Sequence, residues 1–393
     1  MSPEAPRAEG SVLPSAQAAV KARRERPPVF AQILFGLLVL STLRAGGGPA
    51  NTSITDVAML IIIAVYLAPN LLIVKPSAEV SHYLVGFLLV LSAYVVLQLL
   101  MLATVGGSGL VVVKDAFSPL FMVVACILLL PHLTKSDPRL ARFAVVASAV
   151  ILSVSLALDP RARAEGTFSN PNLAGAWAGC ALVLLVAMRY PRRLVLRIPL
   201  ILFVAAAISW TGSFAAMFAV ALSLVYLAAD RLALRPWAKG LLVVLSAGVA
   251  YSLITILDEA GALNRSERSL DSRVVRWLVG LDVWRGQPWG IGPGSYVANG
   301  TFERDGSELH SEFVQALVEL GPIGLLLLIA MGVVLWRVGG ICTRTVIVFM
   351  AAIAIWRDSL NFRFLWLMLG CAIAVDYWQA RTEKAKADVD VDP

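Results

Sequence analysis

Residues 83–105 read YLVGFLLVLSAYVVLQLLMLATV, an uncharged run in which Gln98 is the one amide side chain. A helix of about 20 apolar residues matches the hydrocarbon thickness of a bilayer. Runs of this kind recur along nearly the whole chain of 393 residues, which is 59% hydrophobic and only 15% charged. We therefore expect an all-α, polytopic integral membrane protein and exclude a soluble multidomain protein.

The apolar runs predict about twelve transmembrane helices. They cover residues 29–43, 54–74, 83–105, 110–131, 141–158, 172–188, 197–210, 212–229, 238–256, 314–336, 343–357 and 362–378. This divides the chain into a disordered basic tail (1–28), a transmembrane domain (29–378) and a C-terminal tail (379–393). One large extracytoplasmic loop, residues 257–313, separates the ninth span from the tenth.

The distribution of basic residues predicts the topology. With the basic N-terminal tail in the cytoplasm, the predicted inner segments hold most of the 33 Lys and Arg residues, as the positive-inside rule requires. Both termini are then cytoplasmic, and the net charge of +7 needs no nucleic-acid partner.

The basic residues of the predicted outer segments are all arginines. They are Arg44, Arg161, Arg163, Arg265, Arg268, Arg273, Arg276, Arg285, Arg304, Arg357 and Arg363. A GC-rich coding sequence explains such a bias, and so does a need for guanidinium forks that bind phosphate or carboxylate groups. The sequence leaves both explanations open.

The first half of the large loop predicts an amphipathic helix on the membrane or on the bundle. Its apolar residues recur at spacings of three and four: Leu270, Val274, Trp277, Leu278, Leu281 and Trp284. Arg273 and Arg276, three residues apart, are expected side by side along one edge of its polar face. They would either contact lipid phosphates or clamp a diphosphate.

The second half of the loop, residues 290–313, reads GIGPGSYVANGTFERDGSELHSEF. Its glycines and prolines predict tight turns. Ser307 is a candidate N-cap for the tenth span, which would place His310 in the first helical turn. The helix dipole there disfavours imidazolium, so His310 is a candidate general base. A lone histidine is more often structural than catalytic, so its neighbourhood has to decide.

A second outer loop, DPRARAEGTFSNPNLAG at residues 159–175, is expected on the same side of the membrane. It carries Arg161, Arg163, Asn170 and Asn172 as candidate substrate-binding residues. The other interpretation of the NPN motif is a turn followed by a helix N-cap.

Four motifs in this order resemble the O-antigen ligase and O-antigen polymerase superfamily of bacterial envelope glycan enzymes. They are GTFSNPNLAGAW, SRVVRW, PWGIGPGSY and HSEFVQALVELGPIGLL. The resemblance covers roughly residues 159–336, and the histidine motif with its ELGPIG ending is the most specific part.

The resemblance implies a metal-independent glycosyltransferase without cofactors in the bacterial inner membrane. Its partners would be a polyprenyl diphosphate-linked glycan donor, a lipid or glycan acceptor, and membrane lipids, with no nucleic acid. The sequence contains no Walker A motif, so it does not indicate that the protein uses ATP. His310 would act on the acceptor and Arg273 on the donor diphosphate. Arg276, Arg161, Arg163, Asn170 and Asn172 are the further expected substrate-binding residues.

The chain departs from the family pattern at one position. The family often carries an arginine after a Thr-Gly-Ser turn between two spans, and here the turn reads TGSF, with Phe214. One expected phosphate ligand is therefore missing, and Arg161 or Arg163 would have to replace it.

Other functions stay open at this point. A polymerase of the same superfamily differs only in its acceptor, and a cell-wall glycan polymerase or a non-catalytic scaffold also fits a multispan chain. A transporter or flippase would need ionisable groups within the spans. The candidates are Lys114 and Asp115, which we expect to pair with each other, and the polar residue Gln98.

Overall fold

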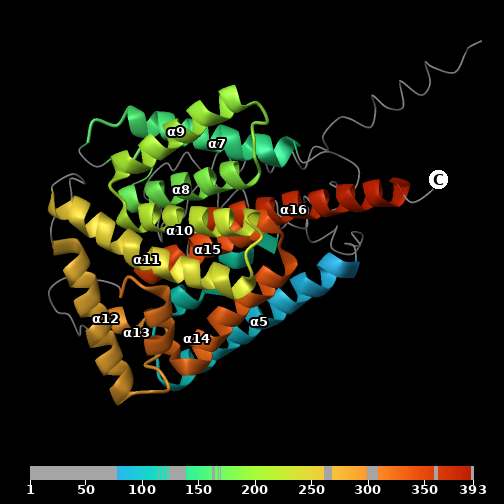
Figure 1. Cartoon of the computed structure of the whole chain (residues 1–393). Coiled ribbons are helices and arrows are strands. Elements are labelled where there is room, and N and C mark those ends of the chain that lie inside the picture. The colour runs from blue at the N-terminus through green and yellow to red at the C-terminus, as the bar shows by residue number, and fades with distance from the viewer. Residues whose placement is uncertain are drawn as a thin grey trace, which may run out of the picture.

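The computed structural model describes residues 78–113, 115–116, 118–120, 122–123, 139–161, 164–166, 168, 170–260, 268–298, 309–357 and 362–390. Within these ranges the structure is helical and contains no strand (Figure 1). The helices are α5 (Ala78–Thr104), α7 (Arg139–Ala157), α8 (Pro171–Ala187), α9 (Leu194–Thr211), α10 (Phe214–Arg231), α11 (Pro236–Glu259), α12 (Arg268–Gly286), α13 (Ser295–Ala298), α14 (Glu312–Val338), α15 (Ile341–Trp356) and α16 (Arg363–Asp390).

Most of the spans predicted from the sequence overlap these helices. The third span corresponds to α5, the fifth to the ninth correspond to α7–α11, and the tenth to the twelfth correspond to α14–α16. The fourth span is described only in part, and the first two spans and the N-terminal tail lie outside the described residues. Helix α16 continues into the predicted C-terminal tail as far as Asp390.

The helices have the length and surface of an integral membrane protein. Among the described residues, five helical segments are long and apolar enough to cross a bilayer: Leu84–Thr104, Leu194–Thr211, Phe214–Arg231, Pro236–Leu253 and Glu312–Arg337. Large apolar side chains cover their outward faces, and Leu89, Leu202 and Val244 are each more than 60% exposed. Lipid tails accept such a surface, whereas water does not.

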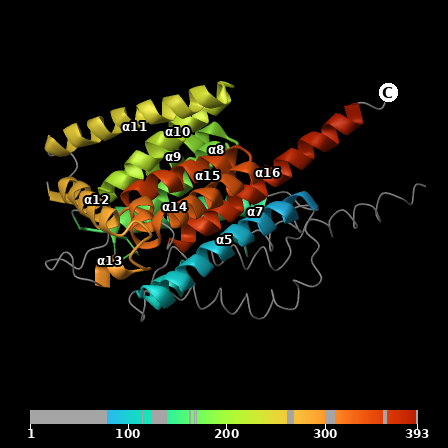
Figure 2. The same cartoon turned by 90° about the horizontal axis from the view of Figure 1, so that it is seen from below.

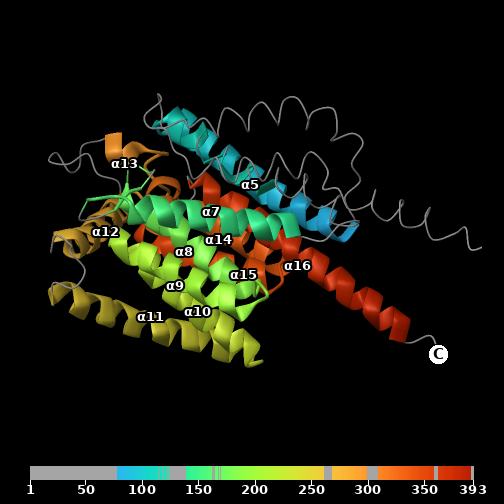
Figure 3. The same ribbon diagram turned by 90° about the horizontal axis from the view of Figure 1, so that it is seen from above.

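Helix α8 lies at the centre of the bundle and contacts α7, α9, α10 and α15. Small residues allow this close packing. A Cβ atom added to Gly179 would lie 2.9 Å from the ring of Phe349 on α15, so glycine is needed there. Helices α5 and α11 lie on opposite sides of the bundle (Figures 2 and 3).

The turns predicted in the PWGIGPG stretch attach to a kink in α14. The kink is at Gly321, whose φ of 69° and ψ of −171° are accessible to glycine. The amides of Ile291 and Gly292 donate to the carbonyls of Val318 and Glu319 at 3.1 and 2.9 Å. The loop is therefore hydrogen-bonded to α14 directly before the kink.

Candidate active site

Helix α12 crosses one end of the bundle, the end opposite to the C-terminus of α16 (Figure 1). The helix predicted from its apolar spacing is confirmed, but the predicted orientation of Arg273 is wrong. Arg273 is buried, with 6% exposure, whereas Leu278 is 58% exposed. The guanidinium faces the bundle because main-chain carbonyls at the helix ends offer it hydrogen-bond partners there.

Two hydrogen bonds and a ring contact help to attach α12 to the bundle. Arg273 Nη1 donates to the main-chain carbonyl of Trp356, the last residue of α15, at 3.4 Å. Trp277 Nε1 donates to the carbonyl of Leu309 at 3.1 Å, and its ring lies 5.0 Å from the ring of Trp356. The surface helix is thus positioned against both α15 and the residue that precedes His310.

The structure corrects the helix start predicted at Ser307, a residue outside the described ranges. Helix α14 begins at Glu312, and Ser311 is its N-cap, whose hydroxyl accepts from the Val314 amide. His310 therefore stands just before the cap rather than in the first helical turn. Its φ of 54° lies in the left-handed region, which few residues other than glycine adopt.

His310 is half-buried, and its pKa is lowered to about 4. The largest cause is burial, followed by the positive charges of Arg357, Arg273 and Arg276. Both effects disfavour the imidazolium form. The sequence predicted a neutral imidazole from the helix dipole, whereas the causes that lower the pKa here are burial and the neighbouring arginines.

Arg357 is the site residue that sequence reasoning missed. It counted only as one of the outer arginines, yet of the three arginines it has the largest effect on the pKa of His310. The sequence did indicate its side of the membrane, because Arg357 directly follows Trp356 at the predicted extracytoplasmic end of a span. We name His310, Arg273, Arg276 and Arg357 the His310 cluster.

Phe214 lies close to this cluster, at the start of α10. Its side chain is fully buried, and its ring meets the ring of Trp356 edge-on at 4.9 Å. It also stacks on Phe218 at 5.9 Å and contacts Tyr251 at 6.1 Å. The position where the family often has an arginine is therefore next to the residue that holds Arg273, but it is filled by an aromatic cluster.

The loop between α7 and α8 holds its polar residues in local contacts. Arg161 pairs with Asp159 at 2.7 Å and also with Glu165, although its side chain is 50% exposed. The hydrogen bond from Arg161 is the main reason why the pKa of Asp159 lies well below its usual range. Arg161 is not among the arginines that lower the pKa of His310.

The NPN motif forms the turn and cap that were its alternative interpretation. Asn170 is the N-cap of α8, and its side-chain oxygen accepts from the amide of Asn172 at 2.9 Å. Arg163 lies outside the described residues. No group of three or more His, Cys, Asp or Glu side chains able to hold a metal ion occurs in the described part of the chain.

Part of the chain is similar to a known protein family. No curated protein matches the chain. Residues 199–329 match the family model of O-antigen ligase. This segment runs from α9 into α14 and includes Phe214, Arg273, Arg276 and His310. Over this third of its length, the integral membrane protein is similar to O-antigen ligase, as the four sequence motifs predicted.

Proposed function

We propose that the protein is an O-antigen ligase-like glycosyltransferase of the bacterial cytoplasmic membrane. It would move a glycan from a polyprenyl diphosphate carrier to an acceptor hydroxyl on the outer face. In this proposal the chain has about twelve spans, both termini are cytoplasmic, and the end of the bundle that carries α12 is extracytoplasmic.

One observation carries the proposal: a neutral histidine stands among three arginines at one end of the bundle. A general base must be unprotonated at working pH, and a diphosphate leaving group needs positive charge. The His310 cluster supplies both functions without a metal ion.

The reaction follows from these roles. His310 accepts the proton of the acceptor hydroxyl while the oxygen attacks the anomeric carbon of the donor glycan. The bond from that carbon to the diphosphate oxygen breaks, and the electron pair leaves with the polyprenyl diphosphate. Arg273, Arg276 and Arg357 stabilise the negative charge that develops on the leaving group.

Arg357 supplies the phosphate ligand that is absent at Phe214. The sequence alone points to Arg161 or Arg163 for that role. Arg161 is engaged by Asp159 and Glu165 in its own loop, whereas Arg357 follows Trp356, which contacts both Phe214 and Arg273. The guanidinium is thus provided by the residue that follows Trp356 in the chain.

A polymerase of the same superfamily is the second candidate, because it uses the same donor chemistry and differs in its acceptor. Transport has less support. Asp115 accepts a hydrogen bond from Gln98 Nε2 at 2.7 Å in a buried pair, so two of the three polar candidates within the spans bind each other. Lys114, the partner predicted for Asp115, lies outside the described residues.

A deletion strain tests the proposal. Loss of a ligase leaves long polymer on the lipid carrier, whereas loss of a polymerase leaves single repeats. The variants His310→Ala and Arg273→Ala are expected to reproduce the deletion while still inserting into the membrane. If the deletion strain has unchanged glycan and unchanged lipid-linked intermediates, the proposed glycosyltransferase activity is refuted.

A further inference from the structure

A group of arginines lies at the end of the bundle opposite to the His310 cluster. Helix α10 begins at Phe214, beside Trp356, and ends at Arg231. Its 18 residues place Arg231 about 25 Å from Phe214 at the helical rise per residue. This end of the bundle is therefore too distant to take part in a reaction at His310.

Three arginines gather around the last turn of α8. The main-chain amide of Arg189 and the guanidinium of Arg231 donate to the same carbonyl, that of Val186, at 3.3 and 2.8 Å. Arg197 is half-buried near the start of α9, and its positive charge and that of Arg189 act on the guanidinium of Arg231. We call Arg189, Arg197 and Arg231 the Arg231 cluster. Because like charges repel each other, an anion bound among them would stabilise the group.

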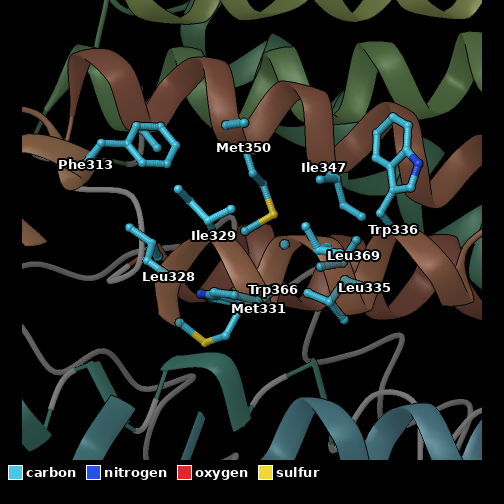
Figure 4. Close-up of a pocket in the computed structure, with 14 residues that line it drawn as sticks. Phe313, Leu328, Ile329, Met331, Leu335, Trp336, Ile347, Met350, Trp366 and Leu369 are labelled. Carbon is cyan, nitrogen blue, oxygen red and sulfur yellow. The ribbon is translucent and has the colours of Figure 1, made fainter. Parts of the chain in front are cut away.

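Arg344, also at this end of the bundle, has its partner within the protein. Its guanidinium carbon lies 5.7 Å from the centre of the Trp336 ring, and its Nε donates to the Trp336 carbonyl at 3.3 Å. Figure 4 shows this ring at one end of an apolar pocket. The Arg231 cluster differs. Among the described residues no carboxylate pairs with its members, and the adjacent Asp230 is bound to Lys239.

Exposed apolar side chains flank the Arg231 cluster. Leu194 and Leu196 at the start of α9, and Leu232 and Trp237 beyond the end of α10, are each more than half exposed. Tryptophan is enriched at the depth of the lipid headgroups, and long basic side chains extend from apolar surface towards the polar interface. Cationic groups bordered by exposed apolar surface are complementary to a molecule with an anionic head and hydrocarbon chains.

We propose that the Arg231 cluster binds the phosphodiester headgroup of an anionic phospholipid such as phosphatidylglycerol. In the proposed topology this lipid belongs to the cytoplasmic leaflet, and the inference does not depend on the proposed glycan transfer. A guanidinium donates parallel N–H bonds to two phosphate oxygens. A zwitterionic headgroup also carries an ammonium group, which the arginines repel, so the cluster favours the anionic lipid.

The loop before α9 offers a matched control. The double variant Arg189→Gln/Arg197→Gln removes two charges of the cluster. Arg192→Gln/Arg193→Gln removes two exposed charges from the same stretch of chain, and neither of these is among the charges that act on Arg231. Arg231 stays unchanged in both variants, because its hydrogen bond connects α10 to the end of α8.

The experiment measures binding of phosphatidylglycerol and of phosphatidylcholine to the delipidated full-length protein in neutral detergent, by native mass spectrometry. We expect the wild type to bind phosphatidylglycerol about tenfold more tightly than phosphatidylcholine. The cluster variant should bind phosphatidylglycerol about tenfold more weakly than wild type, with phosphatidylcholine unchanged, whereas the control variant should stay within about twofold.

A charge-preserving variant covers a failure of folding, which the unfolding temperature without lipid detects. If Arg189→Gln/Arg197→Gln does not fold, Arg189→Lys/Arg197→Lys replaces it. Lysine keeps the charge but lacks the planar fork, so this variant should bind phosphatidylglycerol about threefold more weakly than wild type. Wild-type affinity in the lysine variant would overturn the bidentate contact that the site requires.

Three results would overturn the lipid site. The first is equal weakening of phosphatidylglycerol binding by the cluster variant and the control variant, which would show a diffuse basic surface. The second is equal binding of the two lipids by the wild type. The third is displacement of phosphatidylglycerol by inorganic phosphate at a similar concentration, which would show a phosphate site without a contribution from the acyl chains. The deletion strain tests glycan transfer separately from all three.

Discussion

Arg273 of α12 donates a hydrogen bond to the main-chain carbonyl of Trp356 at the end of α15, 83 residues further along the chain. The bond fixes the guanidinium of a surface helix against the bundle. A guanidinium has five N–H donors in a planar fork, so orientation by one acceptor is compatible with phosphate binding. The same contact therefore packs α12 against the bundle and orients a guanidinium that we propose binds the donor diphosphate.

The variant Arg273→Lys keeps the charge and loses the fork. We expect kcat/KM for glycan transfer from a lipid-linked donor to fall about 100-fold, as when one oriented donor is lost. Arg285→Lys is the matched control on the same helix, because Arg285 is exposed and pairs with Asp282. Wild-type kcat/KM in Arg273→Lys would show that only the charge matters.

The pKa of His310 sets the pH dependence. Since it is lowered to about 4, the base stays neutral through the usual range near 6.5. We expect the acid limb of kcat/KM, which reports the free enzyme, near pH 4. Arg357→Gln removes a repelling charge and should move this limb to higher pH, whereas the surface variant Arg285→Gln should not. A limb near 6.5 in the wild type would contradict the burial of His310.

The same lowered pKa affects stability. Below about pH 6.5 the unfolded chain binds a proton at this histidine, while the folded protein keeps it neutral until about pH 4. Stability is therefore lost as the pH falls through this window. The variant His310→Gln should reduce the fall in unfolding temperature between pH 7 and pH 4.5, measured in detergent. An identical fall in wild type and variant would assign it to other groups.

The sequence predicted the helices well because hydrophobic length and charge bias are local signals. It also placed His310 and Arg273 among the candidate residues. It could not orient α12, since Arg273 faces inward to satisfy a carbonyl contributed by a distant helix. The apolar stripe alone favoured the opposite orientation.

The start of α14 was mispredicted for a similar reason. Ser307 and Ser311 are both good N-caps, and the choice between them depends on contacts of the loop. Ser311 is positioned by its bond to the carbonyl of Ala354 on α15. Arg357 was overlooked because its importance comes from proximity to His310, which no spacing in the sequence reveals.

Phe214 is expected to be structural. Phe214→Leu should cost about 1–2 kcal/mol of stability, because volume is nearly conserved while the ring contacts with Trp356 and Phe218 are lost. Phe214→Arg should cost about 3–5 kcal/mol by burying an uncompensated charge. Thermal unfolding of the purified variants measures both. A stable and more active Phe214→Arg would show instead that the site still accommodates the guanidinium of the family.

The kink at Gly321 should be intolerant of a side chain. A Cβ there would lie 2.8 Å from the carbonyl oxygen of Trp289, and the φ of 69° is strained for alanine. We expect Gly321→Ala to cost about 1–3 kcal/mol and to lower activity by displacing the start of α14. Gly240→Ala on α11, which has open space, should be neutral or stabilising. Equal stability of the two variants would mean that the loop does not fix the kink.

Asn170 tests whether the loop before α8 binds substrate or only holds the helix. Serine also caps helices well, so Asn170→Ser should retain stability and activity if capping is its role. Asn170→Ala should cost about 1 kcal/mol of stability, with KM for the donor unchanged. The measurement is KM and kcat beside the unfolding temperature for the same preparations. A raised KM in the stable Asn170→Ser variant would assign the amide to substrate binding, because the cap is preserved while the amide is lost.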